Sequence, residues 1–129
     1  DTDDLITEKY GNITNIFKTK GEAVFRNYET EVIKQLSAVG GKVIATGGGA
    51  VLRAQNTDLL KRNGRIYFLD RPLESICATP DRPLSSNRED LEKRFNERYD
   101  IYRKCADRHI TSDGTETDTV NAVLEDILK

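Results

Sequence analysis

Glycines, arginines and aspartates are the residues of this chain whose types and spacing could do chemistry. Gly47, Gly48 and Gly49 stand in a row within the stretch ATGGGAV. Glycine suits turns and positive φ, so one interpretation of the run is a flexible connection between two elements. The other interpretation is a loop whose missing Cβ atoms let the backbone come close to a ligand. The residues around the run must decide between the two.

Arg26, Arg82 and Arg98 are the candidates for binding an anion. A planar guanidinium can hold a carboxylate or a phosphate through two parallel hydrogen bonds. Arg26 and Arg98 lie in stretches of helical pattern beside acids, so each can instead be a solvated arginine paired to its neighbours, which is the commoner role. Arg82 lies in the proline-bearing stretch TPDRP, which could close over a phosphate as a lid or be an ordinary loop.

Asp1 and Asp3 are the candidate carboxylates. If the DTD stretch is extended, side chains two residues apart share a face and both carboxylates can act together. If a helix starts here, the acids are the residues that favour such a start, and Asp1 or Thr2 is its cap.

The elements that must position these residues alternate along the chain. Apolar residues at helical spacing predict a long helix over residues 22–38, and a short apolar run before the glycines predicts a buried strand. Asn56 is predicted to cap the next helix. In full, helices are predicted within residues 1–11, 22–38, 56–63, 71–78, 87–106 and 119–129, and strands within residues 42–46, 65–70 and 108–111.

This alternation predicts an α/β fold with a parallel sheet. Ligands of such sheets bind beyond the carboxyl ends of the strands, so the glycine run, the loop after Leu69 and the start of the chain are expected on the ligand side. Residues 79–87 carry two prolines and two serines without apolar periodicity, and they are predicted to form an exposed loop.

Composition narrows the function classes. The 129 residues make one domain's length, with 36% hydrophobic and 33% charged residues and a net charge of −2. Because acids and bases are interleaved, no basic face indicates nucleic acid or a membrane surface. Cys77 and Cys105 form neither a disulfide framework nor a zinc pattern. No apolar run could span a bilayer or serve as a signal peptide, so we expect a cytoplasmic protein.

A spaced pattern then resembles one family. Arg26, Glu29 and Ile33, followed after nine residues by VIATGGGAV, resemble the signature of shikimate kinases. The stretches DTD, IFKTKGEAVFR, DRPL and NERYDIYRKCAD are similar to that family in the same order, so the likeness covers essentially the whole chain. It implies an α/β, three-layer P-loop kinase-like parallel sheet with helices on both faces. Within this domain of residues 1–129, residues 12–40 would be the substrate-binding helical region and residues 79–87 the lid.

The resemblance also implies roles for the candidate residues. Shikimate kinases transfer the γ-phosphoryl group of ATP, with Mg²⁺, to the 3-hydroxyl of shikimate, giving shikimate 3-phosphate for aromatic amino acid (chorismate) biosynthesis. Arg26 and Arg98 would bind the shikimate carboxylate, Asp3 would take or steer the proton of the reacting hydroxyl, and Gly47–Gly49 would offer backbone N–H groups. On the nucleotide side, Arg82 would place positive charge on the migrating phosphoryl group of ATP, and Asp1 would lie near Mg²⁺.

The chain departs from the family pattern in two places. It holds no GxxxxGK[ST] P-loop, whose amides, lysine and hydroxyl bind ATP phosphates and Mg²⁺. It has CATPDRP where the family often has an arginine before the lid. Since the chain also lacks methionine and begins at Asp1, we expect it to be the portion of a kinase that follows the P-loop, inactive by itself. Its expected partners are the missing N-terminal segment or a fused aromatic-pathway enzyme.

Two alternatives remain from the sequence. One is a binding module, either a degenerate homologue that holds a shikimate-like acid or a regulatory domain. The other is a different P-loop small-molecule kinase such as a gluconate kinase, although the glycine triplet coupled to Arg26 favours shikimate kinase over it.

Overall fold

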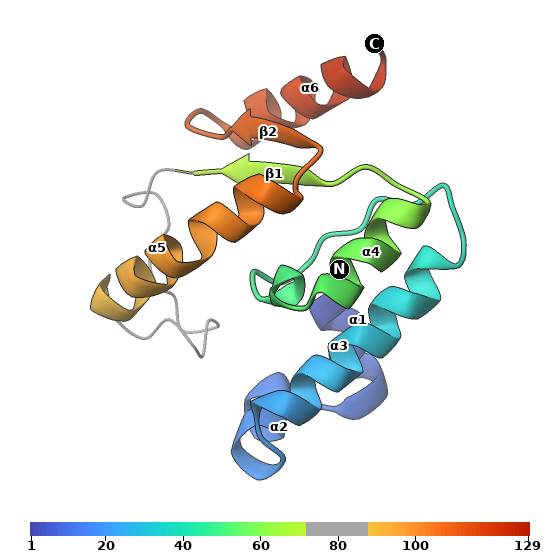
Figure 1. Cartoon of the computed structure of the whole chain (residues 1–129), viewed down its shortest axis with the longest axis vertical. Helices are drawn as coiled ribbons and strands as arrows, with labels where there is room; N and C mark the ends of the chain where they lie inside the picture. The colour runs from blue at the N-terminus through green and yellow to red at the C-terminus, as the bar shows by residue number, and fades with distance from the viewer. Residues whose placement is uncertain (72–87) are drawn as a thin grey trace. The chain divides into compact units, whose positions relative to one another are not determined.

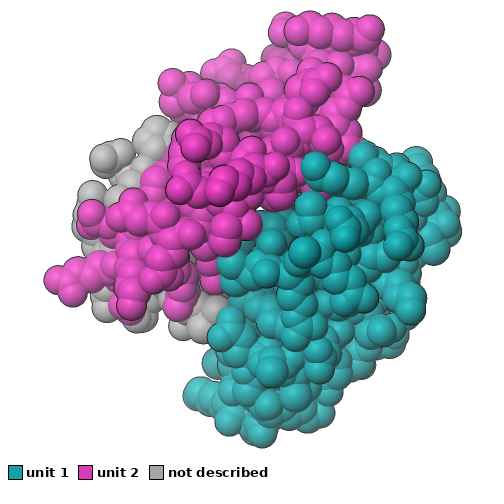
Figure 2. All heavy atoms as spheres, in the orientation of Figure 1, with its two compact units in different colours: residues 1–64 teal, residues 65–129 magenta. Residues whose placement is uncertain are grey.

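The computed structural model describes residues 1–71 and 88–129 (Figure 1). The chain forms two compact units, residues 1–64 and residues 65–129 (Figure 2). All but the first residue of the predicted 71–78 helix, the predicted 79–87 loop and Arg82 lie outside the described residues. None of the described helices is long and apolar enough to cross a membrane.

The first unit is helical. Asp1 caps its first helix as predicted, because the carboxylate accepts hydrogen bonds from the backbone N–H groups of Asp3 and Asp4 at 2.8 and 3.4 Å. Gly11 ends that helix at a φ of 102°. The elements are α1 (Thr2–Tyr10), α2 (Ile13–Thr19), α3 (Glu22–Ser37), the short 3₁₀ helix η1 (Ala50–Leu52) and α4 (Ala54–Arg62).

Helix α3 is the centre of this unit and confirms the predicted long helix. Phe25 and Val32 pack with Ile6 of α1 and Ile16 of α2 in one buried cluster. Ile33 lies in a second cluster, with Ala50 and Leu59. Since residues on more than one side of α3 are buried, the helix is held firmly by α1, α2 and α4.

The predicted strand over residues 42–46 is wrong. No strand is formed there, and Val43 is 99% exposed. A strand exists only where a neighbour satisfies its backbone groups, and no strand of the described residues pairs with this segment. A backbone hydrogen bond of 2.9 Å from the N–H of Thr2 to the carbonyl of Ala45 ties the segment to the start of α1.

The predicted cap at Asn56 is also wrong. Helix α4 begins two residues earlier and has Arg53 at the capping position. Asn56 lies within the first turn, fully buried, and its Nδ2 donates to the carbonyl of Ala50 at 2.8 Å. The amide therefore joins α4 to the short helix η1 as a donor, whereas a cap would use its side-chain oxygen as an acceptor.

The second unit holds the predicted parallel strand pair. Strand β1 (Tyr67–Asp70) runs parallel to β2 (Arg108–Thr111), with Phe68 opposite His109. Helix α5 (Arg88–Cys105) packs on the face of the strand pair that carries Phe68 and His109, and the rings of Phe68 and Tyr102 lie 5.2 Å apart there.

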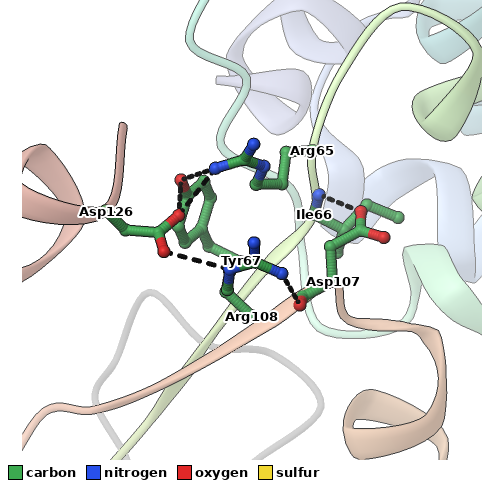
Figure 3. Close-up of polar contacts among 6 residues, drawn as sticks. All are labelled: Arg65, Ile66, Tyr67, Asp107, Arg108 and Asp126. Atoms are coloured by element: carbon green, nitrogen blue, oxygen red, sulfur yellow. Dashed lines mark hydrogen bonds and ion pairs between the residues drawn. The ribbon is translucent and has the colours of Figure 1, made fainter. Parts of the chain in front are cut away.

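The opposite face of the strand pair belongs to α6 (Glu116–Ile127). Because side chains alternate along a strand, Tyr67 and Arg108 point away from α5. Both contact Asp126 of α6, as Figure 3 shows. The strand pair therefore has helices on both faces, as the α/β prediction requires.

Asp126 is the anchor that holds α6 to the strands. Its carboxylate accepts hydrogen bonds from Tyr67 at 2.6 Å, Arg65 at 2.8 Å and Arg108 at 3.0 Å. The hydrogen bond from Tyr67, with those from the two arginines, lowers the pKa of Asp126 to about 2.

Replacing Asp126 with asparagine is expected to lower the free energy of unfolding near neutral pH. The folded-state pKa of about 2 lies below the ordinary 3.8, so the ionised carboxylate stabilises the fold above 3.8 and this stabilisation is lost as the pH falls toward 2. Urea midpoints measured at neutral pH and down to about pH 2 test this. The control is Glu125→Gln on the exposed side of α6. An Asp126→Asn protein with the parent's acid dependence would disprove the anchoring role.

Candidate active site

Asp3 and the glycine turn meet in the first unit. A Cβ built on Gly47 would lie 3.2 Å from Oδ1 and 3.4 Å from Oδ2 of Asp3, so the carboxylate packs directly against the glycine backbone. Asp3 belongs to α1, so the DTD stretch is not extended and does not present its two carboxylates as strand neighbours. The backbone hydrogen bond between Thr2 and Ala45 holds α1 beside the turn.

Arg26 lies against the other end of the turn. A Cβ built on Gly49 would lie 2.5 Å from Cζ of Arg26, closer than side-chain carbons approach in proteins. The arginine is 8% exposed although it sits on a helix. Its Nη1 donates to Glu29 at 3.1 Å and its Nη2 to Glu22 at 3.2 Å. The prediction that neighbouring acids pair with Arg26 is confirmed, but the arginine is not solvated.

Glu29 is the residue of this cluster whose role the sequence did not reveal. Its side chain is fully buried, and its Oε2 has no hydrogen-bond partner in the described structure. Burial raises the pKa of Glu29, while the charge and the hydrogen bond of Arg26 act the other way. The spacing of three residues from Arg26 is a signal for pairing, but nothing in the sequence distinguishes a buried pair from an exposed one.

The electrostatics of Asp3 follow from the same packing. Burial raises the pKa of the Asp3 carboxyl above its usual 3.8, and the negative charge of Asp4 raises it further. Arg26 opposes both effects, which places its positive charge within electrostatic reach of Asp3. The turn thus brings a carboxylate with a raised pKa and a buried guanidinium to one place.

The glycines of this turn are not required by backbone torsion. The described glycines with positive φ are Gly11, Gly21 and Gly41, and Gly49 has right-handed values of −90° and −2°. Two members of the run, Gly47 and Gly49, are instead needed because side chains of the same unit occupy the Cβ positions. The sequence offered close approach of a ligand to the glycine backbone as the alternative to a flexible turn. In the structure, the side chains of Asp3 and Arg26 approach that backbone closely.

If Arg26 binds the carboxylate of shikimate, as the family resemblance implies, replacing Gly49 with alanine is expected to displace the Arg26 guanidinium and to raise the KM for shikimate about 10-fold, the scale of one weakened charge-assisted hydrogen bond. Gly47→Ala should act less, because Asp3 needs to move only a few tenths of an ångström. Steady-state kinetics on the full-length gene product measures both. Gly40→Ala is the matched control, since its Cβ would meet nothing within 4 Å. Equal KM values for Gly49→Ala and Gly40→Ala would contradict the proposed contact.

The remaining predicted residues are placed as follows. Gly48 is an exposed residue of the turn. Asp1 is exposed, and its carboxylate caps α1, so its predicted position near Mg²⁺ stays a prediction. Among residues 1–71 and 88–129, no group of three or more His, Cys, Asp or Glu side chains is arranged to hold a metal. Arg98 is half-buried on α5 of the second unit, and Arg82 lies outside the described residues.

Known proteins match this chain over its length. The family model described as shikimate kinase matches residues 1–128. A shikimate kinase of Clostridium botulinum (strain Alaska E43 / Type E3) is 38% identical over 133 residues, which cover 100% of this chain and 78% of that protein.

Solved structures agree with this match. A shikimate kinase from Acinetobacter baumannii in complex with shikimate has a TM-score of 0.90 at 32% identity, over 98% of this chain and 76% of that one. The shikimate kinase from Aquifex aeolicus vf5 has a TM-score of 0.83 at 32% identity, over 98% of this chain and 78% of that one. The α/β parallel-sheet prediction is confirmed by these structures, and the chain belongs to the shikimate kinase family.

Proposed function

We propose that this chain supplies the shikimate-binding part of a kinase that transfers the γ-phosphoryl group of ATP to the 3-hydroxyl of shikimate. The observation that supports this most is the buried Arg26 guanidinium, held over Gly49 in the unit that also holds Asp3 against Gly47. The neighbour from A. baumannii is a complex with shikimate, a carboxylate that bears hydroxyl groups. A cation and a proton acceptor around one turn suit such a molecule.

Arg26 is proposed to bind the substrate carboxylate. A guanidinium has five N–H donors, and the hydrogen bonds to Glu22 and Glu29 use two of them. The other donors are proposed to bind a third carboxylate, that of the incoming substrate. The two acids hold the fork in a fixed direction before substrate arrives, which reduces the entropy lost on binding.

Asp3 is proposed to accept or steer the proton of the reacting hydroxyl. Its raised pKa makes the carboxylate a stronger proton acceptor than an exposed aspartate. In phosphoryl transfer the protein mainly positions the reactants and neutralises charge, so a held carboxylate beside the nucleophile is the contribution that this unit can make.

The other roles rest on the family resemblance. Arg98 is proposed to bind the substrate carboxylate together with Arg26. Gly48 and Gly49 are proposed to donate backbone N–H groups to the substrate. Arg82 is proposed to neutralise charge on the phosphoryl group. Asp1 is the proposed neighbour of Mg²⁺. Among residues 1–71 and 88–129, Asp1 is engaged as the cap of α1, and no group of three or more His, Cys, Asp or Glu side chains is arranged to complete a metal site.

An ADP-release assay on the full-length gene product tests this function. Turnover should require both shikimate and MgATP. Turnover with another polyhydroxy acid but none with shikimate would overturn the substrate assignment. Calorimetric titrations with shikimate and with ATP distinguish the kinase from the binding-module alternative, because such a module would bind shikimate without binding ATP.

A further inference from the structure

We propose that Asp70, by holding Tyr99 and His109, positions the turn of α5 that carries Arg98 for substrate binding. The proposal rests on the function proposed above, in which Arg98 binds the shikimate carboxylate. Asp70, Tyr99 and His109 are positioning residues here, because they act through Arg98.

The side chains of Tyr99 and His109 both contact one carboxylate oxygen of Asp70. Oδ2 of Asp70 accepts a hydrogen bond from the Tyr99 hydroxyl at 2.7 Å and lies 2.8 Å from Nε2 of His109. Asp70 ends β1, Tyr99 belongs to α5 and His109 to β2, so three elements of the second unit meet at this atom. The Asp70 side chain is 18% exposed, which limits competition from water.

The ring contacts between α5 and the strands are less directional. Phe68 contacts the rings of Tyr99 and Tyr102 with centroid distances of 5.6 and 5.2 Å, at interplanar angles of 74° and 49°. Aromatic pairs tolerate a range of offsets and angles, so these contacts hold α5 near the strands without fixing how far it slides or turns. A charge-assisted hydrogen bond has a narrow range of distance and angle. The bond to Asp70 therefore constrains the position of Tyr99 more closely than these ring contacts do.

The place of this bond in the fold connects it to the site. Asp70 and its register partner Thr111 are the last residues of two parallel strands, the edge at which ligands of α/β sheets bind. Arg98 is the residue directly before Tyr99. A shift of Tyr99 along or around the helix axis moves Arg98 with it, and a misplacement of about 1 Å can cost on the order of 100-fold in an enzyme.

A second tyrosine of the same unit provides the matched comparison. Tyr67, the first residue of β1, also donates to an aspartate, Asp126 (Figure 3). That bond lies at the amino end of the strand and joins α6, which carries no predicted site residue. Both tyrosines lose only a hydroxyl when changed to phenylalanine, so their ring contacts remain.

Tyr99→Phe and Tyr67→Phe should therefore behave differently in the full-length gene product. Tyr99→Phe is expected to raise the KM for shikimate about 3- to 10-fold, the scale of one hydrogen bond to a charged group, with kcat changed less than about 2-fold and the KM for ATP unchanged. Tyr67→Phe is expected to lower the urea midpoint and leave both KM values unchanged. Asp70→Asn keeps an oxygen acceptor for Tyr99 and should give a shikimate KM between the parent and Tyr99→Phe.

The proposal is overturned if Tyr99→Phe lowers the urea midpoint as Tyr67→Phe does while its shikimate KM stays at the parent value. Arg98→Ala separates this failure from a failure of the proposed function. If Arg98→Ala raises the shikimate KM and Tyr99→Phe does not, only the positioning role is wrong. If Arg98→Ala leaves the shikimate KM unchanged, the assignment of Arg98 to the carboxylate is wrong and the positioning role falls with it.

Discussion

Replacing Asp3 with asparagine is expected to lower kcat by about 100- to 10,000-fold, the typical contribution of a positioned general acid or base. The KM for shikimate should change less than about 3-fold, because the amide keeps the size of the carboxylate and its place against Gly47. Steady-state kinetics with shikimate and MgATP on the full-length gene product gives both constants. An unchanged kcat would contradict the assigned role.

The stability of the same variant provides an independent control. The pKa of Asp3 is raised in the folded state, so folding favours the protonated form, and this contribution is lost as the pH rises through the folded-state pKa. At neutral pH the ionised carboxylate therefore disfavours the fold. Asp3→Asn should keep or raise the urea midpoint at neutral pH, so a fall in kcat cannot be attributed to unfolding. Glu8→Gln, exposed on the same helix, is the matched variant for kcat.

Arg26→Ala is expected to raise the KM for shikimate by about 10- to 150-fold, since hydrogen bonds between charged groups contribute about 1.5–3 kcal/mol. The same change leaves the fully buried Glu29 carboxylate without its cation, which costs about 3–5 kcal/mol of stability. Urea unfolding must therefore accompany the kinetics.

Arg26→Lys separates the two effects. Lysine keeps the positive charge beside Glu29 and loses the planar fork, so this variant should fold and still show a KM raised about 10-fold. Arg62→Ala, an exposed arginine of the same unit, should leave the KM unchanged. A folded Arg26→Ala protein with the parent's KM would remove Arg26 from the site.

The helices and the strand segments β1 and β2 were predictable because their signals are local. The spacing of Phe25 and Val32 along α3, and the glycine that follows α1, act within a few turns of one chain segment. Helix α2 escaped prediction because its seven residues are too few to establish a period, although Asn12 caps it by accepting from the N–H of Asn15.

The predicted strand over residues 42–46 failed for a different reason. Apolar β-branched residues such as Val43 and Ile44 describe what a strand prefers, but pairing depends on a neighbour that no local pattern contains. The exposure of Val43 shows that composition alone does not bury a segment.

For the site, the sequence predicted which residues could do chemistry, but it did not predict which of them would be buried. Arg26 beside Glu29 has the same spacing whether the pair is solvated or enclosed, and only the packing of α3 shows that it is enclosed. The substrate roles of Arg26, Arg98 and the glycines stay predictions until the kinetics above are measured.

The enclosed pair has a consequence for engineering. Glu29 keeps a buried oxygen without a partner, and buried ion pairs are often replaced by apolar residues with a gain in stability. A laboratory evolution experiment that selects only for heat resistance should accumulate apolar substitutions at Glu29 and Arg26 and lose catalysis as it proceeds. A selection in which growth also depends on product made by the kinase itself should retain both charges, so the two selections would diverge at these positions.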